Sequence, residues 1–341
     1  MPCEHPDMRR EHPDMSPPET ANLTLRPSAP GPSATSILVV SGSTGTGKTE
    51  SAVRLAERFN GELIGADSVQ IYRGLDIGSA KPTPGELRGV PHHLIDVLEP
   101  TEAIDAAGFA ALADRSIEEI AGRGKVPIVV GGTGLWLRAL LRGLVEVPEV
   151  DPELRAKLEC EAKQLGDKMH DRLRAVDPMA AAKIHPNDRL RIVRALEVFA
   201  QTGSSLGSLR AAHALGRPRY RSLCIALELD RALHRTRLER RLQEMLDLGW
   251  LDEVRCLRAR YGDEIRPLRS VGYRQLQQHL REQTPFDEAR KRVWKATWIY
   301  AKRQRTWLSN EPSVDLRLSA EDLRASEPLL QIERHLANAS R

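Results

Sequence analysis

A glycine-rich segment between a short apolar run and a stretch of helical spacing has the residues of a phosphate-binding loop. Residues 42–49 read Gly-Ser-Thr-Gly-Thr-Gly-Lys-Thr and match G-x-x-x-x-G-K-[ST] at every fixed position. Glycines let backbone N–H groups curl around phosphate oxygens, and the start of the next helix adds partial positive charge. Lys48 can reach the phosphates, and the Thr49 hydroxyl can hold Mg²⁺. The pattern predicts a diphosphate or triphosphate ligand with Mg²⁺, without saying which one.

Two further segments follow strand-like runs and are expected at the same edge of a sheet. Asp67 follows the run 62–66, and Gly131-Gly132 follows the run 126–130. Ligand sites of parallel sheets lie at the carboxyl ends of the strands, so Asp67 is expected to face the phosphate loop across a cleft. Two alternatives stay open: Asp67 caps the turn after it, and the glycine pair forms a tight turn rather than admitting a ligand closely.

Histidines and cysteines offer little metal chemistry in this sequence. His92 and His93 look like a metal pair, but adjacent side chains on a strand point to opposite faces. We therefore expect packed or hydrogen-bonded histidines. The cysteines are far apart, without the spacing of a zinc site or a disulfide framework, and reduced cytosolic thiols are expected; they are Cys3, Cys160, Cys224 and Cys256.

The elements that must position these groups alternate between strands and helices. Apolar runs typical of buried strands occupy 37–40, 62–66, 126–130 and 222–229. Helical spacing predicts helices over 48–59, 107–123, 231–248, 251–260 and 286–308, and a further series without strands over 152–165, 168–176, 179–184 and 189–201. This order predicts the α/β class: a P-loop NTPase-like parallel sheet covered on both faces, with an all-helical insertion domain.

Five regions are expected along the chain. Dense proline and a duplicated Glu-His-Pro-Asp-Met segment predict a flexible N-terminal tail. The regions are the tail at 1–34, the first part of the core at 35–147, the helical insertion at 148–217, the second part of the core with C-terminal helices at 218–310, and a polar tail at 311–341.

Several short segments together resemble the tRNA dimethylallyltransferases (tRNA isopentenyltransferases) of bacterial type. They run in the family's order from about residue 36 to 308 and comprise Thr44–Thr49, Ala66–Tyr72, Asp76–Pro82, His92–Asp96, Gly131–Thr133, Ile184–Asp188, Arg194–Val198, Ser270–Tyr273 and Ala301–Trp307. Three positions depart from the family's usual residue: Ser43, Ser79 and Trp136 stand where proline, threonine and tyrosine are common. None of the three removes a group that the chemistry needs.

The resemblance implies transfer of a dimethylallyl group from dimethylallyl diphosphate to the exocyclic amine of the adenosine 3′ to the tRNA anticodon, with Mg²⁺. Asp67 is implied to orient the amine and take its proton, while Lys48 and Thr49 serve the departing diphosphate. The diphosphate-binding set is Gly42, Ser43, Thr44, Gly45, Thr46, Gly47, Lys48, Thr49 and Arg237 or Arg241, the choice of arginine staying open.

The RNA side of the resemblance involves the insertion and the C-terminal helices. The residues implied to contact the tRNA anticodon stem-loop are Asp67, Ser68, Val69, Gln70, Thr133, Arg155, Leu190, Arg191, Ile192, Val193, Arg194, Leu268, Arg269, Ser270, Val271, Gly272 and Tyr273. A basic face within 290–305 is expected to contact phosphates. Trp294 and Trp298, one helical turn apart, are expected in the core.

Composition sets outer limits on the function. The chain has 341 residues, 29% of them charged, and a net charge of +4, which favours a polyanionic partner. No apolar run approaches the roughly 18 residues of a membrane span, and the N-terminus does not read as a secretory signal. A cytoplasmic monomer without membrane contact is expected. The rival hypotheses are a small-molecule kinase using ATP, a prenyltransferase of free adenine nucleotides, and an RNA-binding module with a vestigial loop.

Overall fold

The computed structural model describes residues 35–144, 147, 150–213 and 218–337. The expected N-terminal tail at 1–34 lies outside the described residues. The chain divides into two compact units, one formed by the residues up to Leu141 and from Arg219 onward, and one formed by Arg142–Pro218. We call them the core unit and the helical unit and describe each separately. The division falls at 142–218, where 148–217 was expected from the sequence.

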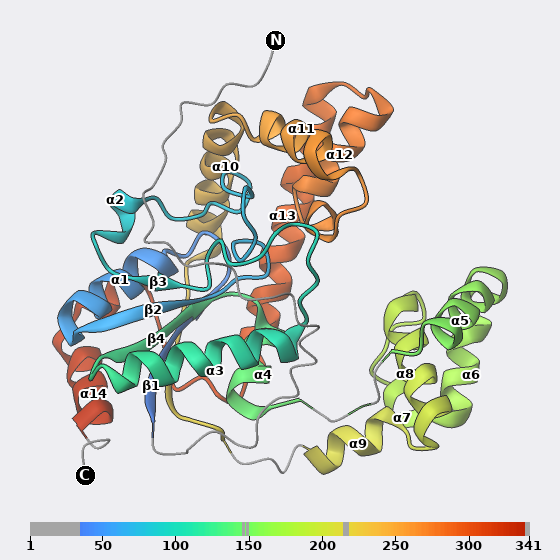
Figure 1. The fold of residues 1–341 in the computed structure, drawn as a ribbon, viewed down its shortest axis with the longest axis horizontal. Helices are drawn as coiled ribbons and strands as arrows, with labels where there is room; N and C mark the ends of the chain where they lie inside the picture. Colours follow the sequence, from blue (N-terminus) through green and yellow to red (C-terminus); the bar gives the residue numbers. More distant parts are fainter. Residues whose placement is uncertain (1–34, 145–146, 148–149, 214–217, 338–341) are drawn as a thin grey trace. The chain divides into compact units, whose positions relative to one another are not determined.

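The core unit is built on a six-stranded sheet in which every pairing is parallel (Figure 1). The strand order is β3-β2-β4-β1-β5-β6. The strands are β1 (Ser36–Gly42), β2 (Gly61–Ala66), β3 (His92–His93), β4 (Val126–Gly131), β5 (Arg221–Leu227) and β6 (Leu316–Leu318). All carboxyl ends therefore meet at one edge, as the alternation of strands and helices predicted.

Nine helices of the core unit accompany this sheet among the described residues. They are α1 (Lys48–Phe59), α2 (Pro84–Leu87), α3 (Ala106–Gly122), α4 (Gly134–Arg142), α10 (Arg231–Asp247), α11 (Trp250–Tyr261), α12 (Tyr273–Glu282), α13 (Phe286–Ser309) and α14 (Ser326–Ala337), with short 3-10 helices at Arg266–Arg269 and Asp322–Arg324. The chain crosses from β1 to β2 and from β3 to β4 in opposite directions along the sheet. Right-handed connections then place α1 and α3 on opposite faces.

Alternate residues of β1 pack on opposite faces of the sheet. Leu38 and Val40 join a buried cluster with residues of α1 and α14, while Ile37 and Val39 are buried on the other side. The predicted bounds of the central elements are close to the observed ones; α1, for example, was expected at 48–59. The sequence pattern therefore located the core of the sheet.

The C-terminal segment corrects one expectation. Residues 311–341 were expected to form a polar tail, but β6 pairs with β5 and places Leu316 beside Ile225. Leu323 and Ile332 are buried in the cluster that covers β1. The described part of the segment completes one edge of the sheet, because several of its apolar residues pack on the core.

Trp294 and Trp298 also differ from expectation. They are half-buried rather than enclosed in the core, and their rings stack with centroids 5.9 Å apart. The guanidinium groups of Arg231 and Arg235 from α10 lie 5.9 Å from the ring centroids of Trp298 and Trp294, and Arg305 lies 5.0 Å from that of Trp298. These cation–π contacts join α10 to α13 at the basic face of α13.

The helical unit contains helices and no strand among its described residues. They are α5 (Pro152–Leu165), α6 (Lys168–Val176), α7 (Pro178–Ala181), α8 (Arg189–Thr202) and α9 (Leu206–His213). Asp151 and Asp188 cap α5 and α8 through backbone N–H groups. The buried cluster of this unit is formed by its own residues, such as Leu173 and Val198.

The two chain ends that border the helical unit lie side by side in the core unit. The N–H of Arg219 donates to the carbonyl of Leu141 at 3.0 Å. Buried Arg219 also donates to the Leu140 carbonyl at 2.9 Å and to the carboxylate of Asp114 at 2.6 Å, and Tyr220 donates its hydroxyl to the same carboxylate. A buried polar network therefore fixes the point where the chain leaves and re-enters the core unit.

None of the helices in the described ranges is both long enough and apolar enough to span a bilayer.

Candidate active site

The segment between β1 and α1 folds as a cradle for an anion. Gly45 and Gly47 have φ angles of +81° and +89°, in the left-handed region that favours glycine. At Gly45 a Cβ would also lie 2.9 Å from the Leu238 side chain. These turns lead directly into α1, whose first N–H groups lack intrahelical partners. The loop therefore ends at a helix N-terminus, as an anion-binding site requires.

Hydrogen bonds inside the loop hold its shape. The Ser43 carbonyl accepts from the Lys48 ammonium and from the Thr46 hydroxyl, both at 2.9 Å. The N–H of Thr44 donates to Gln304 Oε1 of α13 at 2.8 Å. Thr44 was expected to bind diphosphate, but its amide is engaged with α13, so this N–H fixes the loop instead.

Asp67, the first residue after β2, combines the two roles that the sequence left open. Its Oδ1 accepts the N–H groups of Val69 at 2.9 Å and Gln70 at 3.3 Å, so the carboxylate caps the turn. Burial lowers the pKa of both Lys48 and Arg241, and the negative charge of Asp67 partly offsets that shift because it favours their charged forms. The capping carboxylate therefore lies beside the phosphate loop as well.

The glycines after β4 are required by protein contacts. A Cβ at Gly131 would lie 2.2 Å from the Ala66 carbonyl oxygen, and one at Gly132 would lie 2.5 Å from Gln304 Nε2. Gln304 Nε2 donates to the Gly132 carbonyl at 2.9 Å. The close approach that these glycines permit here is that of β2 and α13, and the expected approach of a ligand stays a prediction. Thr133, implied as an RNA contact, accepts the N–H of Ser68 at 3.3 Å.

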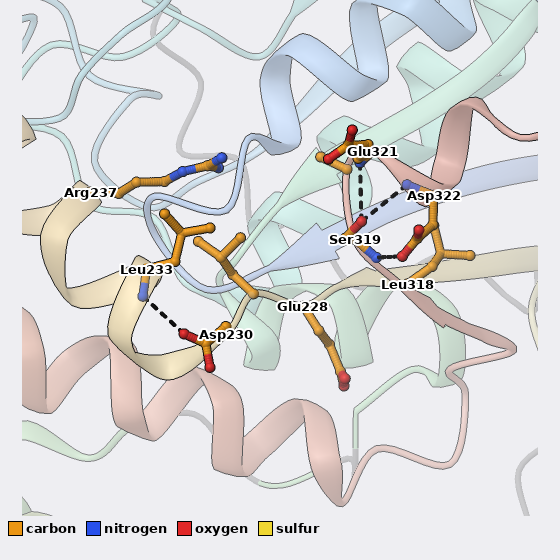
Figure 2. Close-up of a pocket in the computed structure, with 10 residues that line it drawn as sticks. Glu228, Asp230, Leu233, Arg237, Leu318, Ser319, Glu321 and Asp322 are labelled. Atoms are coloured by element: carbon orange, nitrogen blue, oxygen red, sulfur yellow. Dashed lines mark hydrogen bonds between the residues drawn. The ribbon is translucent and has the colours of Figure 1, made fainter.

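Two cavities lie along α10 beside the phosphate loop. The first, of about 480 Å³, is lined by Gly45, Leu233, Thr236, Arg237, Arg240, Arg241 and Glu244. The second, of about 530 Å³, shares Leu233 and Arg237 with the first. Figure 2 shows the second cavity, with those two side chains of α10 on one side and the turn around Ser319 on the other. Both candidate arginines therefore open onto the space next to Gly45.

The charges around Lys48 make this space attractive to an anion. Burial and the neighbouring charge of Arg241 lower the pKa of Lys48 to about 8, although Asp67 opposes the shift. Burial likewise lowers the pKa of Arg241, against the effect of Asp67. Burial, followed by the charge of Asp67, raises the pKa of Tyr300 of α13. Two half-buried cations that disfavour each other's charge favour an anion between them.

In the helical unit, some of the residues implied to contact RNA are exposed and others are buried. Leu190 is 78% exposed, and the side chain of Arg191 is 71% exposed. Arg155 and Arg194 both pair with the fully buried carboxylate of Glu197. Burial raises the pKa of Glu197, but the hydrogen bonds from the two arginines outweigh that effect, and the net pKa is lowered.

Ile192 and Val193 are buried members of the implied RNA set. Their side chains are 1% and 3% exposed and belong to the buried cluster of the helical unit. They face inward because their positions on α8 lie on its apolar side. Their side chains serve the packing of the helical unit, and the implied RNA contact of this segment stays a prediction.

The segment Leu268–Tyr273 shows a similar division. The side chains of Leu268 and Tyr273 are buried, and the implied RNA contact of the segment stays a prediction. Gly272 has a φ of +89° and a Cβ there would lie 2.0 Å from Trp250. Ser270 and Val271 are half-buried, and the Arg269 side chain is 69% exposed. The exposed side chain of Arg269 is the one best able to reach a polyanion.

Glu253 of α11 joins this segment to the Asp76–Pro82 loop. Its carboxylate accepts the N–H groups of Asp76, Ile77 and Gly78 at 2.7, 2.6 and 3.1 Å, and the hydroxyl of Tyr273 at 2.6 Å. Burial and the Glu253 charge hold the pKa of Tyr273 well above its usual range. One carboxylate therefore orders two segments of the family pattern.

The paired histidines lie on opposite faces, as expected. His93 Nε2 is 2.7 Å from Glu62 Oε2. His92 is enclosed, and burial, followed by the charge of His93, lowers its pKa to about 3. Within the described ranges, no group of three or more His, Cys, Asp or Glu side chains is placed to hold a metal.

Reasoning from the sequence missed His234 and Tyr300 and did not place Gln304. His234 Nε2 lies 2.7 Å from the Thr44 carbonyl. Its spacing of three and seven residues from Arg237 and Arg241 puts it on the same side of α10, and this signal was available in the sequence. The approach of α13 to the loop has no such local signal.

Comparison with known proteins identifies the family. A family model described as IPP transferase matches residues 70–311. The chain belongs to the IPP transferase family. The segment matched to this IPP transferase model includes the helical unit, both arginines of α10 and all of α13.

Relatives and solved structures agree with this membership. A protein named tRNA dimethylallyltransferase from Sorangium cellulosum (strain So ce56) is 47% identical over 290 residues, which are 84% of this chain and 91% of that relative. One of the same name from Anaeromyxobacter dehalogenans (strain 2CP-C) is 50% identical over 279 residues, 82% and 93% of the two chains.

Two crystal structures of enzymes that act on tRNA have similar folds. The full-length tRNA isopentenylpyrophosphate transferase from Bacillus halodurans is 35% identical, with a TM-score of 0.64 over 90% of this chain and 96% of that one. A eukaryotic dimethylallyltransferase acting on tRNA is 28% identical, with a TM-score of 0.72 over 89% and 80% of the two chains.

Proposed function

We propose that this protein transfers a dimethylallyl group from dimethylallyl diphosphate to the exocyclic amine of the adenosine 3′ to the anticodon of tRNA. The observation that carries the proposal is the grouping of Lys48, Arg241 and Asp67 beside the phosphate loop of an IPP transferase family member. Two cations suit the diphosphate, and the carboxylate suits the amine.

The donor's diphosphate fits the loop and the first cavity. Its oxygens would accept from the first N–H groups of α1, from Lys48 and from the guanidinium of Arg241. We assign the clamp to Arg241 rather than Arg237, because Arg241 is the arginine whose charge acts on Lys48. Neutralising the diphosphate weakens the bond between the allylic carbon and its oxygen, since the departing group carries the developing negative charge.

The amine of adenine needs orientation and removal of a proton, because its lone pair is delocalised into the ring. Asp67 Oδ1 is held by two backbone N–H groups, and we assign Oδ2 to the amine. The new bond joins the amine nitrogen to the allylic carbon, the carbon–oxygen bond breaks, and diphosphate leaves. The proton from nitrogen passes to Asp67, so no water needs to be activated.

Mg²⁺ fits the residues as an ion carried largely by the substrate. Thr49 at the start of α1 offers one hydroxyl oxygen, and Mg²⁺ commonly binds through one or two protein groups together with substrate phosphates and water. When bound, the ion would supply further positive charge to the departing diphosphate.

RNA contacts in this proposal come from exposed cationic side chains. Arg191 on α8 and Arg269 in the core unit are both exposed, as are Lys302 and Arg303 of α13. Such groups bind phosphates and fix the register of the RNA without reading its bases. An adenosine of a single-stranded loop leaves its stack at lower free-energy cost than one in a duplex.

Mass spectrometry of tRNA nucleosides tests the activity directly. Bulk unmodified tRNA is incubated with the protein, Mg²⁺ and dimethylallyl diphosphate, and the nucleosides are then released. The expected product is adenosine with one dimethylallyl group in place of one hydrogen. Product formed equally well from free adenine nucleotide would favour the free-nucleotide prenyltransferase. Phosphate transfer from ATP without any prenylated nucleoside would favour the kinase, which the family membership opposes.

A further inference from the structure

We propose that His234 of α10 is a positioning residue that orients the phosphate loop through the carbonyl of Thr44 and thereby sets the loop's affinity for diphosphate. The inference rests on the proposed function only in that the loop binds a diphosphate. His234 does not line either cavity beside the loop, so it acts through Thr44 rather than on the ligand.

The hydrogen bonds of His234 define its tautomer. The residue is fully buried, with Nε2 2.7 Å from the Thr44 carbonyl oxygen and Nδ1 2.8 Å from Arg305 Nη1. A guanidinium only donates, so Nδ1 must accept. The ring hydrogen is therefore on Nε2, which donates to Thr44. This arrangement requires a neutral imidazole.

The peptide groups on both sides of Thr44 are held in this way. In a planar trans peptide the C=O and N–H groups point in opposite directions. Gln304 accepts the Thr44 N–H, which turns the Ser43 carbonyl toward Lys48, and that bond is observed at 2.9 Å. By the same geometry, His234 holds the Thr44 carbonyl and turns the N–H of Gly45 away from α10. The direction of a loop donor thus depends on a side chain that does not touch the ligand.

The charges that face His234 keep it neutral. Burial lowers its pKa, the Thr44 carbonyl opposes the shift, and Arg305 of α13, Lys48 of α1 and Arg237 of α10 lower the pKa further. A proton added to Nδ1 would make this nitrogen a donor opposite the N–H donor of Arg305, so the hydrogen bond between the two side chains would be lost. The neutral ring therefore bonds to both Arg305 and the loop.

Isothermal titration of the full chain with inorganic pyrophosphate and Mg²⁺ tests the proposal. The His234→Ala variant is expected to bind about tenfold more weakly near neutral pH, the effect of one lost hydrogen bond. The His234→Gln variant keeps an N–H donor for Thr44 and should bind within about threefold of wild type. His279→Ala is the matched control, because Nδ1 of His279 on α12 also contacts a backbone carbonyl, that of Thr284 at 2.6 Å, and the variant should leave affinity unchanged.

Recovery of affinity by His234→Gln is a readout that a merely structural role would not give, because this variant restores only the donor to the Thr44 carbonyl. Binding by folded His234→Gln that is tenfold or more weaker than wild type would overturn the proposal even if His234→Ala failed to fold. Equal binding by folded His234→Ala and wild type would also overturn it while leaving the proposed function intact. A wild type that does not bind pyrophosphate would remove the diphosphate site and both proposals together.

Discussion

At Asp67, one carboxylate oxygen holds a turn while the charge of the group acts on the phosphate loop. The bonds to Val69 and Gln70 both use Oδ1. An asparagine at this position keeps an oxygen for the two N–H groups but has no basic oxygen for a proton. The structural and chemical roles of the residue are therefore separable by one substitution.

The Asp67→Asn variant is expected to bind tRNA and pyrophosphate nearly as tightly as wild type while its turnover falls by about 10²-fold or more. Single-turnover formation of prenylated adenosine measures the loss. Asp105→Asn is a matched control, since Asp105 also accepts a backbone N–H, that of Gly108 at 2.8 Å, as the cap of α3. Wild-type turnover in Asp67→Asn would remove Asp67 from its assigned role.

The titration of Lys48 makes anion binding at the site depend on pH above neutrality. Its pKa is lowered from 10.5 to about 8, so raising the pH through 8 removes a positive charge from the free loop. Since the charged form binds the anion, affinity for pyrophosphate should fall by about tenfold per pH unit above this pKa. Titration calorimetry over a pH series measures the slope. A Lys48→Arg variant should lack this limb, and the same slope in that variant would assign it to another group.

Among the elements, those with strong local patterns were predictable and those stabilised by distant partners were not. Apolar runs in the sequence predict the central strands, and helical spacing predicts α1. β3 has only His92 and His93, and β6 has three half-exposed or exposed residues, so neither carries an apolar run. The helix α14 had a readable signal, because Leu329, Ile332 and Leu336 are spaced three and four residues apart and pack on the core.

The candidate site shows the same division between local and distant information. The phosphate loop is one continuous segment, so its residues and chemistry could be read in order. Gln304 and Tyr300 come from α13, which reaches the loop only through the tertiary packing of the core unit. The burial of Ile192 and Val193 could likewise not be predicted, because a motif match indicates that a segment lies near a partner but does not indicate which side chains point inward.

Glu253 connects α11 to the Asp76–Pro82 loop, and its removal would leave several donors without an acceptor. The Glu253→Ala variant is expected to lower the free energy of unfolding by about 2–4 kcal/mol. Equilibrium unfolding in urea, followed by circular dichroism, measures the change. Glu239→Ala is the control: its exposed pair with Arg235 should contribute less than about 1 kcal/mol. Equal effects of the two variants would contradict the anchoring role of Glu253.

For the whole molecule, the helical unit is an insertion whose two ends are bonded to each other. Leu141 and Arg219 are joined by a 3.0 Å hydrogen bond, so a short Gly-Ser linker can replace residues 142–218 without separating these ends. The phosphate loop, Asp67 and α10 all belong to the core unit. Diphosphate binding can therefore be tested without the RNA contacts that we assign to α8.

The shortened chain is expected to bind pyrophosphate within about threefold of the full chain and to lose tRNA affinity by about tenfold or more. Titration calorimetry and a filter-binding assay measure the two affinities, and circular dichroism checks that the shortened chain is folded. Undiminished tRNA affinity in the folded shortened chain would place the RNA contacts outside α8.

The pairing of β1 with β5 has a consequence for synthesis of the chain. β1 pairs along seven residues with β5, which leaves the ribosome only after residues 142–218 have been made. The buried cluster of the helical unit comes from one continuous stretch of the chain. This unit can therefore pack before β5 is available to pair with β1. Until translation reaches residue 227, one side of β1 is an open strand edge, a surface prone to pairing with other chains. Slow codons within 142–218 would lengthen that interval and the risk of aggregation with it.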